Sequence, residues 1–256
     1  IVKPDIPEIH RNLYIPEEAL NGAKAGDRVF VGDILWTNPK INPEAKVVEV
    51  VAKGEGVNVD VITIAREFNL PFKFAKNSLE EARAISEEIP AEEIARREDF
   101  REKNVFTIDP EDAKDFDDAL SLETLPNGNY EIGIHIADVS HYVTQHSSLD
   151  KDALERGNSV YLVGAVIPML PEELSNGICS LVPYRDRLTY SVVVEMSPRA
   201  KVINYRIVKT VINSKRRFSY EEAQQVIETG KGDLASDITI LNKIAVALRT
   251  KRMKSG

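Results

Sequence analysis

The stretch Val105-Phe-Thr-Ile-Asp-Pro-Glu-Asp-Ala-Lys-Asp-Phe-Asp-Asp-Ala-Leu-Ser-Leu-Glu-Thr-Leu125 sets a run of acidic residues between two segments with strand character. Residues 105–108 are apolar, and residues 119–125 alternate apolar and polar side chains, as a half-buried strand does. Residues 130–137 alternate again, and Asn127-Gly128 predicts a tight hairpin between the two alternating runs, because glycine tolerates positive φ. The stretch therefore predicts strands whose core holds both ends of an acidic loop.

The acidic loop crowds carboxylates into ten residues, with only Lys114 to offset them. They are Asp109, Glu111, Asp112, Asp115, Asp117 and Asp118. Carboxylates held this close repel one another, so either some of them bind protons or a cation lies among them. Hard oxygen ligands select Mg²⁺, Mn²⁺ or Ca²⁺ over zinc.

Three interpretations of the loop compete. A calcium loop that starts at Asp109 fails in its register, because position 6 is Lys114 instead of glycine and position 12 is Leu120 instead of glutamate. An exposed acidic turn and a metal site fit the bare spacing about equally well. A metal site of this kind would suit phosphoryl transfer, in which divalent ions orient a water and stabilise the leaving oxygen.

The first 70 residues predict a small β-barrel. Runs rich in β-branched and aromatic residues at 28–36, 46–52 and 58–65 read as strands, and prolines and glycines separate them. The character then changes, because Ser78 and Glu81 form a capping-box pattern that opens a helix. A second short helix is expected at 91–100. We place the domain boundary near residue 90, giving domains 1–89 and 90–256.

The C-terminal part predicts further strands at Leu188–Glu195 and Val202–Val211 and a helix at Tyr220–Ile227. Ser219 and Glu222 form a second capping-box pattern at the start of that helix. His135 alternates with apolar neighbours and is expected to be a satisfied strand residue, while Cys179 is expected to be a small buried residue. Four arginines are candidates for phosphate contacts, with no choice among them: Arg185, Arg187, Arg216 and Arg217.

The charge of the chain is unevenly distributed. The net charge is −8, yet residues 80–118 hold 15 acidic and 6 basic residues, and no acidic residue lies between Arg199 and Phe218. A metal-dependent enzyme that acts on a polyanion fits this pattern, although charge alone favours two solvated faces of opposite sign. With 43% hydrophobic and 29% charged residues, the composition excludes disordered, collagen-like and low-complexity classes.

Compartment and membrane signals are few. The single cysteine permits no intrachain disulfide, which is compatible with a reducing compartment, and we expect a cytoplasmic location. No apolar run approaches the roughly 18 residues that a membrane-spanning helix needs, so we expect no membrane association.

Four consecutive blocks resemble the ribonuclease II / ribonuclease R family of 3′-to-5′ exoribonucleases. They are Thr107–Ala119, Glu131–Val143, Ser159–Pro171 and Leu174–Pro183, and the last two are more similar to ribonuclease R. The segments starting at Tyr14 and Gly26 resemble the cold-shock domain that precedes the catalytic domain in that family. The resemblance implies a cold-shock (OB-like) β-barrel followed by a mixed α/β catalytic domain that is truncated at its C-terminal side.

The resemblance also implies a function and a site. The activity would be Mg²⁺-dependent hydrolysis of RNA from a single-stranded 3′ end, with release of nucleoside 5′-monophosphates. Asp109 and Asp118 resemble the direct Mg²⁺ ligands, Asp115 supports the metal site and catalysis, and Asp117 resembles the residue needed for cleavage but not for RNA binding. Tyr161 lies where the family stacks a ring on the 3′-terminal base, although by itself it reads as a core aromatic. The alternative function is an RNA-binding OB module with a catalytically incomplete fragment.

Overall fold

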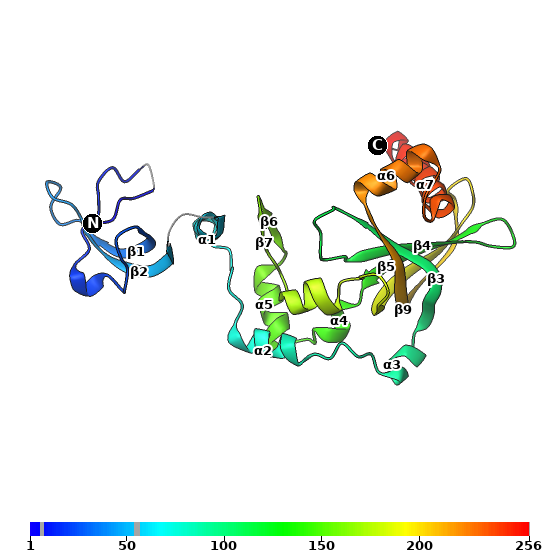
Figure 1. Cartoon of the computed structure of the whole chain (residues 1–256), viewed down its shortest axis with the longest axis horizontal. Helices are drawn as coiled ribbons and strands as arrows, with labels where there is room; N and C mark the ends of the chain where they lie inside the picture. Colours follow the sequence, from blue (N-terminus) through cyan, green and yellow to red (C-terminus); the bar gives the residue numbers. More distant parts are fainter. Residues whose placement is uncertain (6–7, 54–56, 256) are drawn as a thin grey trace. The chain divides into compact units, whose positions relative to one another are not determined.

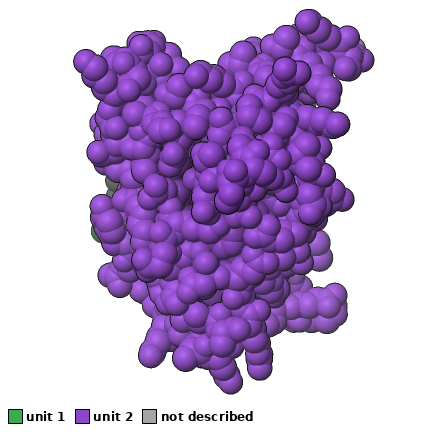
Figure 2. Space-filling model, turned by 90° about the vertical axis from the view of Figure 1, so that its right-hand side faces the viewer, with its two compact units in different colours: residues 1–73, 159–167 green, residues 74–158, 168–256 purple. Residues whose placement is uncertain are grey.

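The computed structural model describes residues 1–5, 8–53 and 57–255, and the chain divides into two compact units. The first unit is Ile1–Lys73 with Ser159–Ile167, and the second is Phe74–Asn158 with Pro168–Gly256. The second unit fills the view of Figure 2. The chain passes between the units after Lys73, and the boundary near residue 90 stays a prediction about independently folding domains.

The second unit is built on a closed five-stranded barrel. Its strands are β3 (Glu98–Asp109), β4 (Asp118–Thr124), β5 (Tyr130–Ala137), β8 (Asp186–Met196) and β9 (Val202–Ser219), in the order β3-β4-β5-β8-β9 (Figure 1). Neighbouring strands are antiparallel, except that β9 closes the barrel by pairing in parallel with β3. The strands predicted at 188–195 and 202–211 are confirmed as parts of β8 and β9.

The interior of this barrel contains a buried polar chain. The His135 imidazole is fully buried, with Nε2 3.0 Å from the Ser121 hydroxyl and Nδ1 2.7 Å from the Ser191 hydroxyl. Ser191 in turn bonds to the Thr210 hydroxyl. Gly133 makes room for the ring, because a Cβ there would lie 2.4 Å from His135 Nε2. His135 is therefore the satisfied strand residue that the sequence predicts.

Helices surround the barrel at its ends and on one side. They are α2 (Lys76–Ala84), α3 (Ala91–Ala95), α4 (Val139–Tyr142), α5 (Ser148–Arg156), the π-helix η2 (Glu173–Ile178), α6 (Tyr220–Thr229) and α7 (Ala235–Lys254). Helices α6 and α7 cover the outer side of β3, β4 and β9, where Phe106 and Phe218 meet edge to face at 5.8 Å. The predicted capping box of Ser219 and Glu222 is confirmed at the start of α6.

Two helix predictions in this unit are wrong. Ser78 is not the N-cap of α2 but lies inside the helix, and its hydroxyl donates to the Ser148 carbonyl at 3.0 Å. Its supposed capping partner Glu81 instead accepts from the backbone of Ser148 and Leu149, at the start of α5. The helix expected at 91–100 ends at Ala95, because the chain enters β3 at Glu98 and pairs there with β9.

The first unit contains the antiparallel pair β1 (Asp27–Leu35) and β2 (Glu44–Lys53), the short helix η1 (Glu17–Ala19), helix α1 (Val57–Glu67), and the hairpin of β6 (Val160–Leu162) and β7 (Ala165–Ile167). Its apolar core is formed by Leu13, Ile15, Ala45 and Val47.

The strand predicted at 58–65 is wrong, because these residues belong to α1. The run also places apolar residues three and four apart, which suits a helix face as well as a strand. The helix buries Ala65 completely, and Arg66 pairs with Glu49 of β2. These contacts override the β-propensity of the run.

Candidate active site in the acidic loop

The acidic loop, residues 109–118, joins two neighbouring strands of the barrel. It leaves β3 at Asp109 and enters β4 at Asp118. These strands pair through Val105 with Ser121 and Phe106 with Leu120, so both ends of the loop are fixed close together. The barrel thereby gathers the four predicted aspartates, Asp109, Asp115, Asp117 and Asp118, at one end.

Phe116 anchors the second half of the loop between two of these aspartates. Its side chain is buried in the main core of the second unit. Its N–H donates to the Ser180 hydroxyl at 3.0 Å, and its carbonyl accepts from the Leu181 N–H at 2.9 Å. The next carbonyl, that of Asp117, accepts from the Ala137 N–H at 3.0 Å. The backbone that carries Asp115 and Asp117 is therefore held on both sides.

Arg217 of β9 anchors the first half of the loop. In the β3–β9 register it lies opposite Thr107, two residues before the loop begins. Its Nη2 donates to the carbonyl oxygens of Pro110 at 2.5 Å and Glu111 at 2.7 Å. Its guanidinium carbon lies 5.6 Å from the centre of the Phe116 ring. The guanidinium group of Arg217 thus fixes the turn between Asp109 and Asp115 through backbone carbonyls.

The aspartates oppose one another electrostatically. Burial raises the pKa of Asp109. The negative charges of Asp118 and Asp115 raise it further, whereas Thr107 and Arg217 act to lower it. Loss of hydration also raises the pKa of Asp117, although part of this side chain stays exposed, and its three aspartate neighbours add to the shift. The fold therefore holds like charges together at a cost that a cation would relieve.

The donor chemistry of the loop fits a hard divalent cation. Within the described residues, Asp109 Oδ2 is buried and has no hydrogen-bond partner. Carboxylate oxygens are the ligands that Mg²⁺ prefers. The described side chains do not preform a ligand shell, because no three His, Cys, Asp or Glu residues among them lie in an arrangement that would hold a metal.

The four candidate arginines differ in burial and in their contacts. Arg187 is buried and donates to the carbonyl oxygens of Ser180 and Gly177, and Arg216 pairs with Glu222 at 2.9 Å. Arg217 holds the acidic loop. Arg185 is exposed, which leaves it the most accessible of the four for a phosphate.

Tyr161 lies on β6 in the first unit and is 65% exposed, so its interpretation as a core aromatic is wrong. It pairs with Val166 across the hairpin, and the turn uses Gly164 at a φ of 77°. Its position relative to the aspartates stays a prediction. Cys179 is buried, as expected, and burial raises the pKa of its thiol to about 12.

Sequence reasoning missed a buried ion pair beside the barrel. Arg97 Nη2 lies 2.7 Å from Asp138 Oδ2, and both side chains are almost completely buried. Arg97 also contacts Glu93 at 2.8 Å. The only sequence signal was an aspartate directly after the alternating strand 130–137. This pair braces the start of α4 and lies outside the acidic loop.

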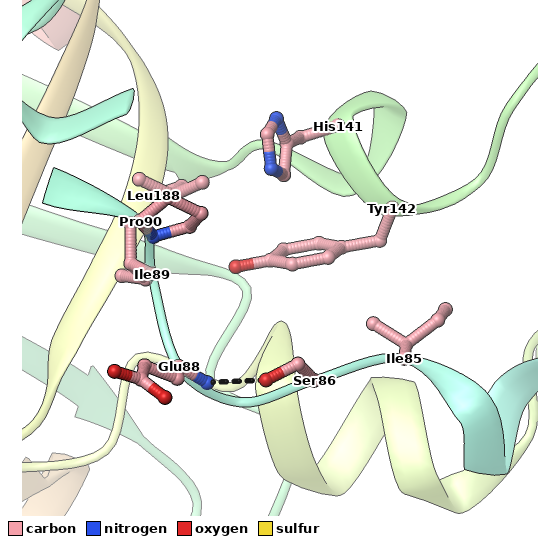
Figure 3. A pocket seen from close by; sticks show the side chains of 8 residues that line it. All are labelled: Ile85, Ser86, Glu88, Ile89, Pro90, His141, Tyr142 and Leu188. Atoms are coloured by element: carbon pink, nitrogen blue, oxygen red, sulfur yellow. Dashed lines mark hydrogen bonds between the residues drawn. The ribbon is translucent and has the colours of Figure 1, made fainter. Parts of the chain in front are cut away.

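A cavity of about 290 Å³ lies elsewhere in the second unit (Figure 3). Tyr142 points its hydroxyl across it toward Ile89 and Pro90. The full lining is Ile85, Ser86, Glu88, Ile89, Pro90, His141, Tyr142 and Leu188. None of the four predicted aspartates contributes to this lining, so the cavity is separate from the acidic loop.

Comparison with known proteins points to one family. The RNB domain family matches residues 97–256, and the cold shock domain family matches residues 1–75. Ribonuclease R of Thermotoga maritima is 45% identical over 229 residues, which cover 89% of this chain and 32% of that protein. Ribonuclease R 1 of Lactococcus lactis is 46% identical over 200 residues, which cover 78% of this chain and 24% of that protein.

Solved structures share the fold. RNase R of Mycoplasma genitalium in complex with double-stranded RNA matches with a TM-score of 0.83 at 24% identity, over 96% of this chain and 45% of that chain. Yeast Ssd1, described as a pseudonuclease, matches with a TM-score of 0.73 at 19% identity, over 98% of this chain and 32% of that one. The predicted fold class, a cold-shock domain followed by a mixed α/β catalytic region, is confirmed. The chain spans about a quarter to a third of the length of the two curated relatives described above.

Proposed function

Because the chain belongs to the RNB domain family and carries a cold shock domain before that region, we propose that it forms part of a Mg²⁺-dependent hydrolytic 3′-to-5′ exoribonuclease. The products are nucleoside 5′-monophosphates. The observation that supports this proposal most strongly is the acidic loop, whose four aspartates are gathered at one end of the barrel. One buried carboxylate oxygen of Asp109 has no hydrogen-bond partner among the residues that the structure describes. An acidic turn exposed to water would have no such oxygen, because water would hydrate all of its carboxylate groups.

In this proposal Asp109 and Asp118, at the two ends of the loop, would hold the metal, and Asp115 would support them. A Mg²⁺ ion held there would supply a lowered pKa for a water and charge neutralisation at the scissile phosphate. The Asp117 carboxylate accepts a hydrogen bond from the attacking water and orients it toward the phosphorus. Arg217 and Phe116 keep the loop backbone in place while the charge in the site changes.

The proposed substrate is RNA with a single-stranded 3′ end. The similar structures of M. genitalium RNase R include complexes with double-stranded RNA and with ribose methylated single-stranded RNA. The exposed ring of Tyr161 suits stacking on a terminal base of any sequence, because every base has a π-face. Arg185 is the exposed one of the four candidate arginines and is the one we propose to contact a phosphate.

A second candidate function is an RNA-binding module whose catalytic region does not cleave. One observation favours it: yeast Ssd1, a protein described as a pseudonuclease, shares the fold. Both functions predict RNA binding that weakens with salt. Only the exonuclease predicts Mg²⁺-dependent release of mononucleotides.

The deciding experiment uses the complete polypeptide that carries these 256 residues and a 5′-labelled, single-stranded homopolymer RNA. We expect stepwise shortening from the 3′ end in Mg²⁺ but not in EDTA, with nucleoside 5′-monophosphates as products. Asp117→Asn should lower the single-turnover rate by about 10²-fold or more and leave RNA affinity within a few-fold. Asp112→Asn, an exposed acid of the same loop, is the matched control and should cleave normally.

RNA binding without mononucleotide release by the wild type would support the binding module instead. Equal cleavage by Asp117→Asn and Asp112→Asn would remove Asp117 from the mechanism.

The place of action is part of the same proposal. In the portion of the chain that the structure describes, no helix combines the length and apolar content needed to cross a bilayer. We propose the cytoplasm, since the single cysteine suits a reducing compartment.

A further inference from the structure

Ser180 is a completely buried serine whose hydroxyl bonds to the backbone on both sides of Asp115. The hydroxyl donates to the Lys114 carbonyl at 2.8 Å and accepts from the Phe116 N–H at 3.0 Å. Asp115 is the residue between these two backbone groups. The Ser180 hydroxyl oxygen thus bonds to the backbone on both sides of Asp115, the residue that supports the proposed metal site.

The segment that carries Ser180 is itself rigidly held. The Ser180 carbonyl accepts from Arg187 Nε at 2.8 Å, and Arg187 Nη2 donates to the Gly177 carbonyl at 3.2 Å. The next residue, Leu181, donates its N–H to the Phe116 carbonyl at 2.9 Å. Ser180 therefore couples β8, through the buried Arg187, to the loop segment 114–116.

This support matters because the carboxylates of the loop repel one another. Repulsion favours loop conformations in which the backbone at 114–116 rotates and separates Asp115 from Asp117. That rotation breaks both bonds of the Ser180 hydroxyl and leaves buried polar groups unpaired, which is costly. Groups that orient metal-binding or catalytic side chains from behind commonly change activity 10- to 100-fold when removed.

We propose that Ser180 is a positioning residue for the acidic loop: it acts through Asp115 and Asp117 and touches neither RNA nor metal. The inference rests on the proposed function, because it assigns these two aspartates to the site of cleavage. It extends that function to a segment 64 residues away along the chain from Phe116.

The test replaces Ser180 with alanine in the complete polypeptide that carries these residues. We expect the single-turnover cleavage rate to fall about 10- to 100-fold and the Mg²⁺ concentration for half-maximal rate to rise. The dissociation constant for RNA should stay within about threefold, because the hydroxyl has no ligand contact. A merely structural residue would lower stability without moving the Mg²⁺ dependence.

Ser121→Ala is the matched control, since it removes another buried serine hydroxyl, one that bonds to His135 inside the barrel. It should melt earlier and keep the wild-type Mg²⁺ dependence. If Ser180→Ala does not fold, Ser180→Cys takes its place, because a thiol of similar size bonds only weakly to the backbone.

Three outcomes decide the matter. A wild type that releases no mononucleotides overturns the proposed function and the role of Ser180 with it. An active wild type with an unchanged Mg²⁺ dependence in the Ser180 variant overturns this inference alone. An active wild type with a raised Mg²⁺ requirement in Ser180→Ala, but not in Ser121→Ala, supports it.

Discussion

At the scale of single residues, Asp109 combines the features expected of a metal ligand. One carboxylate oxygen is buried without a hydrogen-bond partner among the described residues, and burial together with Asp118 raises the pKa of the group. The ionised side chain is therefore held in the fold at a cost in stability. If Asp109 is a metal ligand, a substitution that removes its charge should lower the affinity for the metal. The same substitution should not lower the stability of the metal-free protein.

We predict that Asp109→Asn weakens Mg²⁺ binding while the melting temperature without metal stays the same or rises. Calorimetric Mg²⁺ titration and thermal melts with and without Mg²⁺ measure both effects, since a ligand that binds only the folded state raises the melting temperature. Asp112→Asn serves as the charge-matched control. Equal Mg²⁺ affinity for the two variants would show that Asp109 does not contact the metal.

Tyr161 provides the second prediction at this scale. Because its side chain is 65% exposed, Tyr161→Ala should change the melting temperature little. A base stacked on the ring would contribute roughly 1–3 kcal/mol to RNA binding, so the variant should bind short RNAs more weakly and release longer end-products. A thermal melt beside an end-product ladder separates the possibilities. An unchanged ladder would argue against stacking on this ring.

At the scale of elements, a carboxylate of α2 caps the N-terminus of α5. Glu81 of α2 accepts from the Ser148 N–H at 2.9 Å and the Leu149 N–H at 3.2 Å. These are the first two N–H groups of α5, and Ser147 satisfies the third, that of Asp150. A negative charge at a helix N-terminus also interacts favourably with the helix dipole. One helix thus caps another across 67 residues of sequence.

We predict that Glu81→Ala lowers the free energy of unfolding by about 1–2 kcal/mol, as loss of a helix cap does. Denaturant unfolding measures this change. Glu80→Ala is the control, because Glu80 is exposed and, among the described residues, forms one ion pair, with Lys76 at 3.5 Å. Its loss should therefore cost less than about 0.5 kcal/mol. Equal losses in the two variants would mean that Glu81 does not cap α5.

At the scale of the whole molecule, the barrel of the second unit is closed around a histidine that must stay neutral. His135 is fully buried between two serine hydroxyls, and burial, with a smaller contribution from Lys103, lowers its pKa from 6.5 to about 4. The unfolded chain takes up the proton near pH 6.5, whereas the folded barrel does not. The contribution of neutral His135 to the stability of the fold is therefore complete above pH 6.5 and is lost as the pH falls from 6.5 towards 4.

We predict that the free energy of unfolding decreases as the pH is lowered through this window, by a total of roughly 3 kcal/mol at about 1.4 kcal/mol per pKa unit. Denaturant unfolding at closely spaced pH values measures the slope. His135→Gln removes the titrating ring and should flatten the slope between pH 6.5 and 5, above the range in which most carboxylates titrate. A slope that persists in this variant would assign the effect to another group.

Local patterns in the sequence were sufficient wherever neighbouring residues decide the structure. The alternation in 119–125 and 130–137 predicted β4 and β5, because a strand turns every second side chain to the same face. Ser219 and Glu222 predicted the start of α6, since both partners of a capping box lie within one turn. The acidic loop was recognisable because its carboxylates are close in sequence and lie between two strands.

Only the tertiary structure decided which distant groups hold the loop. Arg217 and Ser180 reach it across 106 and 64 residues of sequence, through backbone carbonyls and an N–H that carry no sequence signal. Long-range contacts also turned Glu81 from the expected partner of Ser78 into the cap of α5, and residues 58–65 from an expected strand into a helix. The physical reason is the same in each case. Hydrogen bonds and burial between segments far apart in sequence form only when the chain folds within each unit, and these interactions outweigh local propensity.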